Sequence, residues 1–425
     1  MDGASSSSST AWWREPTRGQ WASFAAAWIG WVLDAFDFTV FLLVMPLIGK
    51  EFHVGITATA GSITLTLLVR LLGGAVAGWA ADRWGRKLPL MISVVWFAVC
   101  DGLVGLAPSF LFVLVVRTIF GFGMGAEWTS GATLAMENWP ARSRGIASGI
   151  LQGSWAIGYL AAATAAAFVV PRFGWRALFL LAAAPALLAL PIRAWVPEST
   201  EWKRAAEAAP NKASWSAMLR APGLVRRLAW ASVAMAAGFG AYYALTGVYA
   251  PLLVKEHGLD LGGIAKLVAL FNVGMLLGSV ATGWLAARRG VVAAVVVPAL
   301  AMCVAMPLYV GLRPELLGVG AFLGGALGAG YAGTTPLLLT SLFPAAHRAR
   351  AVGLVYHLGA FGAAFVPVGI AALAEHEGLL LSHSLGLVAG ACELVLALCL
   401  LLGPRDLGRE AAESSAPAGE PALLH

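Results

Sequence analysis

Long runs of apolar residues, separated by short polar stretches, fill the chain from about residue 21 to residue 403. A helix that crosses the hydrocarbon core of a bilayer needs about 20 predominantly apolar residues. Runs of that size lie at about 21–48, 57–81, 88–107, 110–136, 144–170, 175–195, 226–254, 264–287, 291–311, 315–342, 350–373 and 383–403. The apolar residues form whole blocks rather than amphipathic stripes, so lipid is the expected solvent. The pattern predicts an all-α membrane protein with 12 transmembrane helices.

A polar segment at 197–225 divides these runs into two groups of six. We expect it to be a cytoplasmic linker between six-helix bundles at 21–196 and 226–403. Polar tails at 1–20 and 404–425 are expected on the same side. The first tail shows neither a short apolar core nor a small-residue cleavage site, so the first apolar run is interpreted as a permanent span.

A short pattern occurs once in each predicted half. The string GWAADRWG at 78–85 is matched by GWLAARRG at 283–290, a shift of 205 residues. A second match relates Arg144 to Arg348, a shift of 204 residues. The two matches follow the second and fourth spans of their half, as expected for an internal structural repeat. We therefore predict two pseudo-symmetric six-helix halves.

Composition agrees with lipid surroundings, since 59% of the residues are hydrophobic and only 12% are charged. That charged fraction is too low to cover a soluble protein of 425 residues. Four cysteines lie inside apolar runs and are interpreted as small apolar fillers. The sequence carries no recognisable nucleophile–base pair, metal cluster or phosphate loop. We expect neither enzymatic activity nor a metal or cofactor.

The basic residues predict the orientation in the membrane. With the N-terminus in the cytoplasm, six of the 28 Lys and Arg residues lie outside, Arg70 and Arg117 lie inside spans, and the remaining 20 are cytoplasmic. This positive-inside bias predicts that both termini are cytoplasmic, in a plasma membrane such as the bacterial inner membrane. It also explains the net charge of +6 without a nucleic-acid partner.

The loop after the second span resembles the signature loop of the major facilitator superfamily. The residues that carry the resemblance are Gly78, Asp82, Arg83, Gly85, Arg86 and Lys87. The resemblance implies that this loop latches the cytoplasmic ends of the two halves, and that Glu137 and Arg144 complete the latch. Gly78 permits close helix approach, and Asp82 can face a helix N-terminus or pair with a base. The second copy has Ala287 in place of Asp82, so we expect its latch to be weaker.

A narrower resemblance lies in the first half. Asp34-Ala35-Phe36-Asp37-Phe38 looks like the Asp-x-x-Asp of proton-coupled organic acid permeases. The run from Ser148 to Gly153, together with Arg70, Arg117 and Glu127, is similar to the lactate and sialic acid carriers of that group. The resemblance implies alternating-access symport of a proton with a small organic acid anion. Lactate-like monocarboxylates, sialic acid and aromatic acids all stay open as substrates.

Ionisable residues inside spans cost free energy to bury, and they usually mark a transport pathway or an ion pair. We find five in the first half, at Asp34, Asp37, Arg70, Arg117 and Glu127. Three acids against two cations leave one carboxyl without a base, and burial favours the neutral form of such a group. We predict Asp37 as the leading proton carrier with Arg117 as its partner, and Asp34 and Glu127 as alternatives. The competing interpretation is a set of purely structural ion pairs.

A guanidinium group binds a carboxylate bidentately, so Arg70 and Arg117 are predicted to bind the acid. Other polar residues predicted to contact the substrate are Gln152, Tyr242, Tyr243, Asn272, Tyr331 and His357. Glu393, alone in the last span, is expected to be neutral or bonded to its own helix. The expected partners are the organic acid anion, a proton and the lipid bilayer, with the chain acting as a monomer.

Two other functions stay open on the same fold. An efflux antiporter of drugs or metabolites would carry a Gly-Pro pair in span five, where this chain has Ile157-Gly158-Tyr159. A membrane sensor on a transporter scaffold would be expected to carry a long soluble tail, which the segment 404–425 does not provide.

Overall fold

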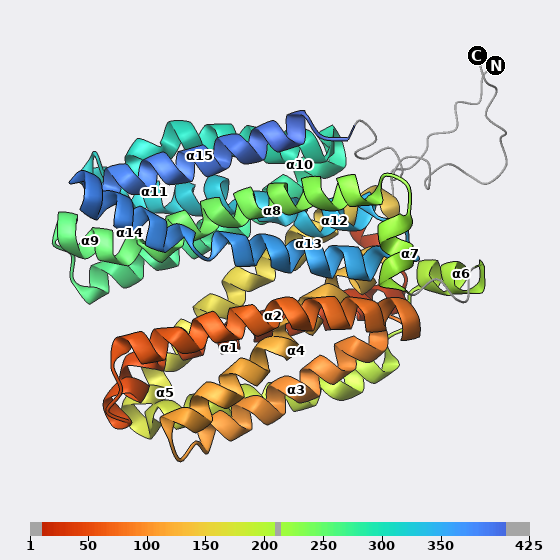
Figure 1. Ribbon diagram of the computed structural model, residues 1–425, viewed down its shortest axis with the longest axis horizontal. Coiled ribbons are helices and arrows are strands. Elements are labelled where there is room, and N and C mark those ends of the chain that lie inside the picture. Colours follow the sequence, from red (N-terminus) through yellow and green to blue (C-terminus); the bar gives the residue numbers. More distant parts are fainter. Residues whose placement is uncertain (1–10, 209–213, 405–425) are drawn as a thin grey trace.

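The computed structural model describes residues 11–208 and 214–404, and within these ranges it consists of helices and short connections without a strand. Ten helical segments are long and apolar enough to cross a membrane. Two of them each hold two of the predicted spans, because the chain reverses within them at a glycine. The fold is therefore all-α with 12 spans, as the hydrophobic pattern predicts (Figure 1).

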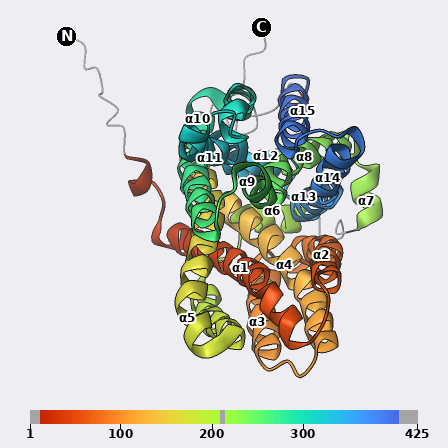
Figure 2. The ribbon, with the colours of Figure 1, turned by 90° about the vertical axis from the view of Figure 1, so that its left-hand side faces the viewer.

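The first half is built from five long helices that lie together in both views (Figures 1 and 2). They are α1 (Arg18–Glu51), α2 (Ile56–Trp84), α3 (Lys87–Gly105), α4 (Phe110–Asn138) and α5 (Arg144–Trp195). Helix α1 starts where the Thr17 side chain accepts a hydrogen bond from the Gln20 amide, which satisfies a free N–H of the first turn. Helix α5 contains predicted spans five and six, which separate at Gly174 with φ of +75°. Only glycine adopts this backbone conformation readily.

The second half has more breaks. Its elements are α8 (Leu224–Gly247), α9 (Tyr249–His257), α10 (Leu261–Tyr309), the 3₁₀ turn η3 (Pro314–Leu316), α11 (Leu317–Leu323), the π-helix η4 (Gly324–Ala329), the 3₁₀ helix η5 (Gly330–Thr334), α12 (Thr335–Leu342), α13 (Arg348–Ala363), α14 (Val366–Glu377) and α15 (Leu381–Leu401). Helix α10 holds two spans that separate at Gly290, with φ of +84°. Predicted span seven comprises α8 and α9, and span eleven comprises α13 and α14.

Between α11 and α12, span ten passes through a π-helix and a 3₁₀ helix, which interrupts the α-helical hydrogen bonds at membrane depth. Side chains from other spans bond some of its backbone groups. Thr282 donates its hydroxyl to the Gly330 carbonyl at 2.7 Å. Ser148 of α5 donates to the Gly333 carbonyl at 2.7 Å and accepts from the Leu337 amide at 3.1 Å. Ser148 thus joins the two halves through backbone groups, as expected where irregular backbone is buried in a membrane protein.

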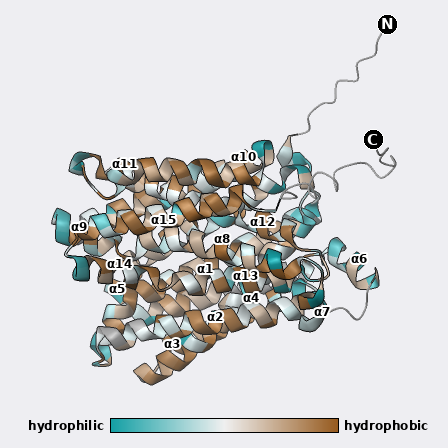
Figure 3. Cartoon of the chain, turned by 45° about the horizontal axis from the view of Figure 1, so that its top comes forward, coloured by the Kyte–Doolittle hydropathy of each residue, from teal (hydrophilic) through white to brown (hydrophobic). Residues whose placement is uncertain are grey.

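The outer surface is suited to lipid. Hydrophobic residues extend along the helices, while hydrophilic residues gather at the two ends of the molecule (Figure 3). Large apolar side chains such as Leu111, Val304 and Val368 are 67–82% exposed on this outer face. An apolar surface of this extent is stable in hydrocarbon and unfavourable in water.

The two halves meet along two seams that correspond by pseudo-symmetry. In the α2–α13 seam, a Cβ atom at Gly78 would lie 2.6 Å from the Ala349 carbonyl oxygen. In the α5–α10 seam, a Cβ atom at Gly283 would lie 2.5 Å from the Gly145 carbonyl oxygen. Both distances are too short for any side chain, so each seam requires glycine for its backbone contact.

The linker between the halves contains two short helices, α6 (Thr200–Ala208) and α7 (Trp215–Arg220). It leaves α5 at the end of the molecule where α1 begins and α15 finishes, here called the termini end (Figure 1). Both carboxylate oxygens of Glu198 accept amide hydrogens at the start of α3, from Arg86 at 3.0 Å and from Lys87 at 3.1 Å. The linker is therefore bonded to the helical bundle before α6 begins.

Candidate functional site

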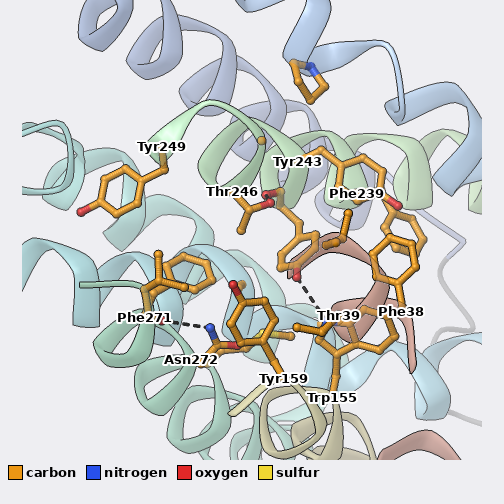
Figure 4. Close-up of a pocket in the computed structure, with 18 of the residues that line it drawn as sticks. Phe38, Thr39, Trp155, Tyr159, Phe239, Tyr243, Thr246, Tyr249, Phe271 and Asn272 are labelled. Carbon is orange, nitrogen blue, oxygen red and sulfur yellow. Dashed lines mark hydrogen bonds between the residues drawn. The ribbon is translucent and has the colours of Figure 1, made fainter. Parts of the chain in front are cut away.

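A cavity of about 470 Å³ lies between the halves. Its volume falls within the range of about 300–1,000 Å³ that is typical of small-molecule sites. The walls come from α1, α2 and α5 of the first half and from α8, α9, α10, span ten, α13 and α14 of the second (Figure 4). Six residues predicted to contact substrate line it, namely Arg70, Gln152, Tyr242, Tyr243, Asn272 and Tyr331.

Aromatic side chains make most of the wall, and the sequence prediction did not include several of them. These are Trp31, Phe38, Trp155, Tyr159, Phe239, Phe271 and Tyr309. The Trp155 indole donates a hydrogen bond to the Tyr242 hydroxyl at 3.2 Å, which joins the halves across the cavity (Figure 4). In a sequence these residues look like ordinary apolar packing, so only the cavity identifies them. The site presents flat, weakly polar surfaces.

Arg70 is the one charged residue among those that line the cavity. Its side chain is 4% exposed, and within the described part of the chain its Nε and Nη2 atoms have no hydrogen-bond partner. The guanidinium carbon lies 5.8 Å from the centre of the Tyr356 ring. The Oε1 atom of Gln152, on the same cavity wall, also accepts no hydrogen bond from the described residues. Unused donors on a buried cation fit a carboxylate ligand.

Behind Arg70, buried acids of the first half gather near one level. Asp34 is fully buried and lies within electrostatic reach of Arg70 and Glu127. No donor of the described residues bonds either Asp34 carboxylate oxygen. Glu127 accepts the Ser93 hydroxyl at 2.7 Å. Asp34 is therefore close to both Arg70 and Glu127.

Arg117 lies elsewhere than predicted. It does not line the cavity, and its guanidinium packs between Phe41 and Phe120, with its carbon 4.5 Å and 4.1 Å from the two ring centres. Its nearest ion-pair partner is Asp101, with 3.8 Å between Arg117 Nη1 and Asp101 Oδ1. In this conformation Arg117 is placed to interact with buried acids rather than with a ligand in the cavity.

The inventory of five buried charges in the first half is wrong, because Asp101 of α3 is a sixth. Its side chain is fully buried and lies in contact with Asp37. The signal was present in the sequence, since Asp101 falls inside the predicted span 88–107.

Two further buried groups lie away from the cavity lining. The His357 Nε2 atom lies 3.1 Å from the Gly125 carbonyl and 3.3 Å from the Thr129 hydroxyl, so the ring is held in the packing between α4 and α13. Both Glu393 carboxylate oxygens are buried, and no donor of the described residues reaches them. The expected bond from Glu393 to its own helix is not among the contacts.

At the termini end, Asp82 joins the two halves. Its Oδ1 accepts from Arg86 at 2.9 Å and from the Ala349 amide at 3.1 Å. Its Oδ2 accepts from Arg350 Nε at 2.8 Å and from the Arg350 amide at 3.2 Å. Asp82 therefore occupies the N-terminus of α13, where a negative charge is favourable, and also pairs with bases from both halves.

Arg86 connects the same cluster to α4 through two hydrogen bonds to Glu137, at 2.9 Å and 3.1 Å. Arg86 lies between two spans and is fully buried. Burial by itself lowers the pKa of this guanidinium, but Glu137 and Asp82 outweigh burial and raise the pKa above its usual range. Arg83 is exposed and outside these ion pairs. Gly85 has a φ of +100° and lies where the chain turns beside the Glu198 carboxylate.

The linker adds an acid to this cluster that the sequence prediction left out. Glu201 of α6 pairs with Arg144 of α5 at 3.2 Å and also with Arg348 of α13. Arg348 in turn pairs with Glu137 at 3.0 Å. The predicted latch residue Arg144 is thus connected to the second half through the linker. Glu201 was counted with the polar linker, because its partners are distant in sequence.

An aromatic layer separates the cavity from this charged cluster. Trp128 and Tyr356 stack with 3.4 Å between ring centres, which joins α4 to α13. Trp31 and Trp155 pack with 4.9 Å between centres. With the aromatic layer and the ion pairs both formed, the halves are in contact at the termini end.

The arrangement of two helical halves around a central cavity agrees with the comparison of the sequence with known families. Residues 27–312 and 246–424 match the Major Facilitator Superfamily. The chain belongs to this superfamily. Its members are membrane transporters rather than enzymes, and this chain is accordingly a multi-pass membrane transporter.

Several known proteins are similar over most of their length. The sialic acid transporter NanX of Escherichia coli is 30% identical, over 91% of this chain and 95% of the relative. The cis,cis-muconate transport protein of Acinetobacter baylyi is 29% identical, over 83% of this chain and 87% of the relative. Among solved structures, the proton:xylose symporter XylE superposes with a TM-score of 0.76 at 19% identity, covering 92% of this chain and 97% of that one. This last likeness concerns the fold.

Proposed function

We propose that this transporter carries a small organic acid anion together with a proton, by alternating access between the two halves. The observation that carries the proposal is Arg70, the only charged residue among those lining the cavity, with two donor atoms unused. A carboxylate binds both donors of a guanidinium fork in one plane. The similarity to transporters named for sialic acid and for cis,cis-muconate supports an organic acid.

Among the acids considered, planar aromatic or conjugated acids fit the cavity better than sialic acid. Rings such as Trp155, Tyr159 and Phe239 offer faces for stacking. A polyhydroxylated acid would need many hydrogen-bond partners, and each hydroxyl buried without one costs free energy. The polar groups of the wall are Asn272, Gln152, two threonines and the tyrosine hydroxyls, and several already bond the protein. Asn272 donates to the Val268 carbonyl, Thr246 to the Tyr242 carbonyl and Tyr309 to the Leu245 carbonyl. Lactate is smaller than the cavity and would leave most of the aromatic wall without contact.

For the proton, Asp37 is the leading carrier and Arg117 its partner, with Asp34 and Glu127 as alternatives. Asp37 is buried and lies within electrostatic reach of Arg117. A pair that forms in one conformation and separates in the other would link proton occupancy to the movement of the halves. The other two functions have less support, because a single cation at the substrate wall matches an anionic substrate better than a drug or a signal.

The proposed orientation places both termini and the linker 197–225 in the cytoplasm. With that orientation, the charged cluster closes the cytoplasmic side and the cavity belongs to an outward-facing or occluded state. Tags at the N-terminus, in the linker and at the C-terminus should be reached by a membrane-impermeant label only after permeabilisation. Labelling of the linker in intact cells would reverse the assignment.

The substrate is tested by uptake into proteoliposomes. We expect an aromatic or conjugated monocarboxylate, in a panel with lactate and sialic acid, to accumulate when an inward proton gradient is imposed. Arg70→Lys keeps the charge and loses the planar fork, so substrate affinity should fall about 10- to 100-fold, as for a lost charge-assisted hydrogen bond. Arg313→Lys, at an exposed position of the opposite end, is the matched control.

Two results would contradict the proposal. Tight binding of the acid by Arg70→Ala would make Arg70 a structural residue. Accumulation against a gradient by Asp37→Asn, which imitates a permanently protonated carboxyl, would exclude Asp37 as the essential carrier. Counterflow of substrate by the same preparation measures binding and exchange without net proton movement, so it separates a coupling defect from misfolding.

A further inference from the structure

The acid that sequence reasoning missed, Asp101, has surroundings that distinguish it from a structural ion pair. Asp101 of α3, Asp37 of α1 and Arg117 of α4 lie together inside the first half, and their side chains are 0–1% exposed. The gap between Arg117 Nη1 and Asp101 Oδ1 is 3.8 Å, too long for a hydrogen bond. The cation therefore neutralises the site without fixing either carboxyl group.

The two carboxyl groups have no other hydrogen-bond donors. No N–H or O–H group of the described residues reaches any of the four oxygens of Asp37 and Asp101. The contact that remains is between one carboxyl and the other. Two carboxylates in contact at low dielectric repel strongly, whereas a proton between them converts the repulsion into a hydrogen bond.

Arg117 provides an independent indication that the site is incomplete without a proton-dependent partner. Its Nε and Nη1 atoms are buried and have no hydrogen-bond partner among the described residues. Its two aromatic neighbours, Phe41 and Phe120, hold the guanidinium plane in place. A single positive charge balances a carboxyl pair that holds one proton, so the group of three is neutral in that state.

The charged and titratable groups around the pair can be named element by element. Helix α1 contributes Asp34, α3 contributes Cys100, and α4 contributes Arg117. Helix α5 packs on the same region with apolar side chains, including Ala162 and Phe179. No second cation of the described residues enters this group.

We propose that Asp101 and Asp37 bind one transported proton between them, so that Asp101 is a proton-binding residue of the coupling cycle. This inference rests on the proposed proton-coupled function and extends it to a residue of α3. Asp34 is within electrostatic reach of Arg70 and also of Arg117 and Asp101. A ligand carboxylate at Arg70 would change the electrostatic potential at Asp34 and, through it, at the pair.

The test compares proton-driven accumulation with counterflow in the same reconstituted protein. An inward gradient of one pH unit supports about tenfold accumulation for each coupled proton. We expect Asp101→Asn to lose this accumulation while keeping counterflow, which is also the result expected for Asp37→Asn. Asp101→Glu restores an acid and should recover accumulation, with the half-maximal rate at a changed pH. Glu393→Gln removes a lone buried carboxyl of the second half and should leave accumulation unchanged.

The outcomes separate this inference from the proposed function. If the parent protein accumulates an organic acid with the proton gradient and Asp101→Asn does the same, Asp101 is structural and the inference is overturned. If the parent protein shows no proton-driven accumulation, the proposed function itself fails. Should Asp101→Asn not fold, infrared spectra of the parent protein decide. A protonated-carboxyl band at neutral pH that Asp37→Asn removes supports the shared proton, and its absence overturns it.

Discussion

The α2–α13 seam and the α5–α10 seam occupy corresponding positions in the two halves, and both depend on a glycine that lets two helix backbones touch. They differ one turn further along. The first has Asp82 at the N-terminus of α13, bonded to Arg86 and Arg350. The second has Ala287 against the start of α5, where a Cβ atom at Gly145 would lie 3.2 Å from the Ala287 Cβ.

The difference between the seams separates two contributions to the contact between the halves, close backbone packing and buried ion pairs. Close backbone packing determines where the halves can touch, and it is present in both seams. The buried ion pairs determine how strongly they hold, and they are concentrated in one seam. The molecule therefore has a strong and a weak contact at its termini end, and the strong one should control the rate of opening there.

The largest effect is expected from Asp82→Asn. Removing one partner from a buried ion pair costs about 3–5 kcal/mol, because Arg350 is left buried without its carboxylate. The closed termini end should lose at least about a hundredfold in population, with substrate affinity unchanged within a few fold. Distances between spin labels on the two halves measure the population. Arg83→Gln, on the exposed side of the same loop, is the control. If Arg83→Gln opened the termini end as much as Asp82→Asn, the buried ion pairs would not be what holds this seam closed.

The next effect should be equal in the two seams. Gly78→Ala and Gly283→Ala each place a methyl group within 2.6 Å of a backbone oxygen of the facing helix. Each should destabilise the closed end by about 1–3 kcal/mol, the range for overpacking. Thermal stability and label accessibility of the two variants measure this. A strongly unequal pair would show that the seams differ in packing as well as in charge.

A smaller effect of opposite sign is expected from Ala287→Asp. The new carboxylate would face the first amides of α5, as Asp82 faces those of α13, and favourable charges at a helix terminus contribute about 0.3–2 kcal/mol. We expect a more populated closed state, slower transport, and partial rescue of Asp82→Asn. Ala287→Asn has a similar size without the charge and should show little of this. Faster opening in Ala287→Asp would contradict the correspondence of the two seams.

The smallest effect is expected from Glu201→Gln. Glu201 pairs with Arg144 at the start of α5 and with Arg348 at the start of α13, so it touches both seams, but its side chain is 30% exposed. Exposed pairs contribute about 0–1 kcal/mol and weaken in salt. Transport rates should change less than about fivefold, and the difference from the parent should shrink as salt is raised. A salt-independent loss of transport would assign Glu201 a larger role.

The spans were predictable because membrane crossing is a local property of about 20 residues, which hydropathy reads directly. The kinks at Gly174 and Gly290 and the irregular helix of span ten were not, because they depend on backbone conformation rather than on polarity. Contacts between the halves could not be predicted from local sequence patterns either, since Asp82 and Arg350 are 268 residues apart in the chain.

Only part of the candidate site could be predicted, because its residues come from helices that are distant in the sequence. Arg70 stood out because a charge in a span is rare, and it lines the cavity. Arg117 stood out equally, yet it is packed between rings behind the wall. Part of the aromatic wall was missed, because rings such as Trp155 and Phe239 are common in any membrane helix. The sequence shows that a charged residue lies inside a span and is costly to bury there. The direction in which its side chain points follows from the packing of the helices.

Ser148 has a consequence for how the halves separate. Its hydroxyl bonds the Gly333 carbonyl and the Leu337 amide across the boundary between α5 and span ten. Span ten departs there from regular α-helical hydrogen bonding. If the halves separate at this depth, those two backbone groups lose their partner, and hydrocarbon offers no replacement. Water has to follow the opening gap and hydrate them, since a bridging water is nearly as favourable as the direct bond. Opening and wetting of the pathway are then a single event, and osmotic stress that withdraws water should slow the transporter.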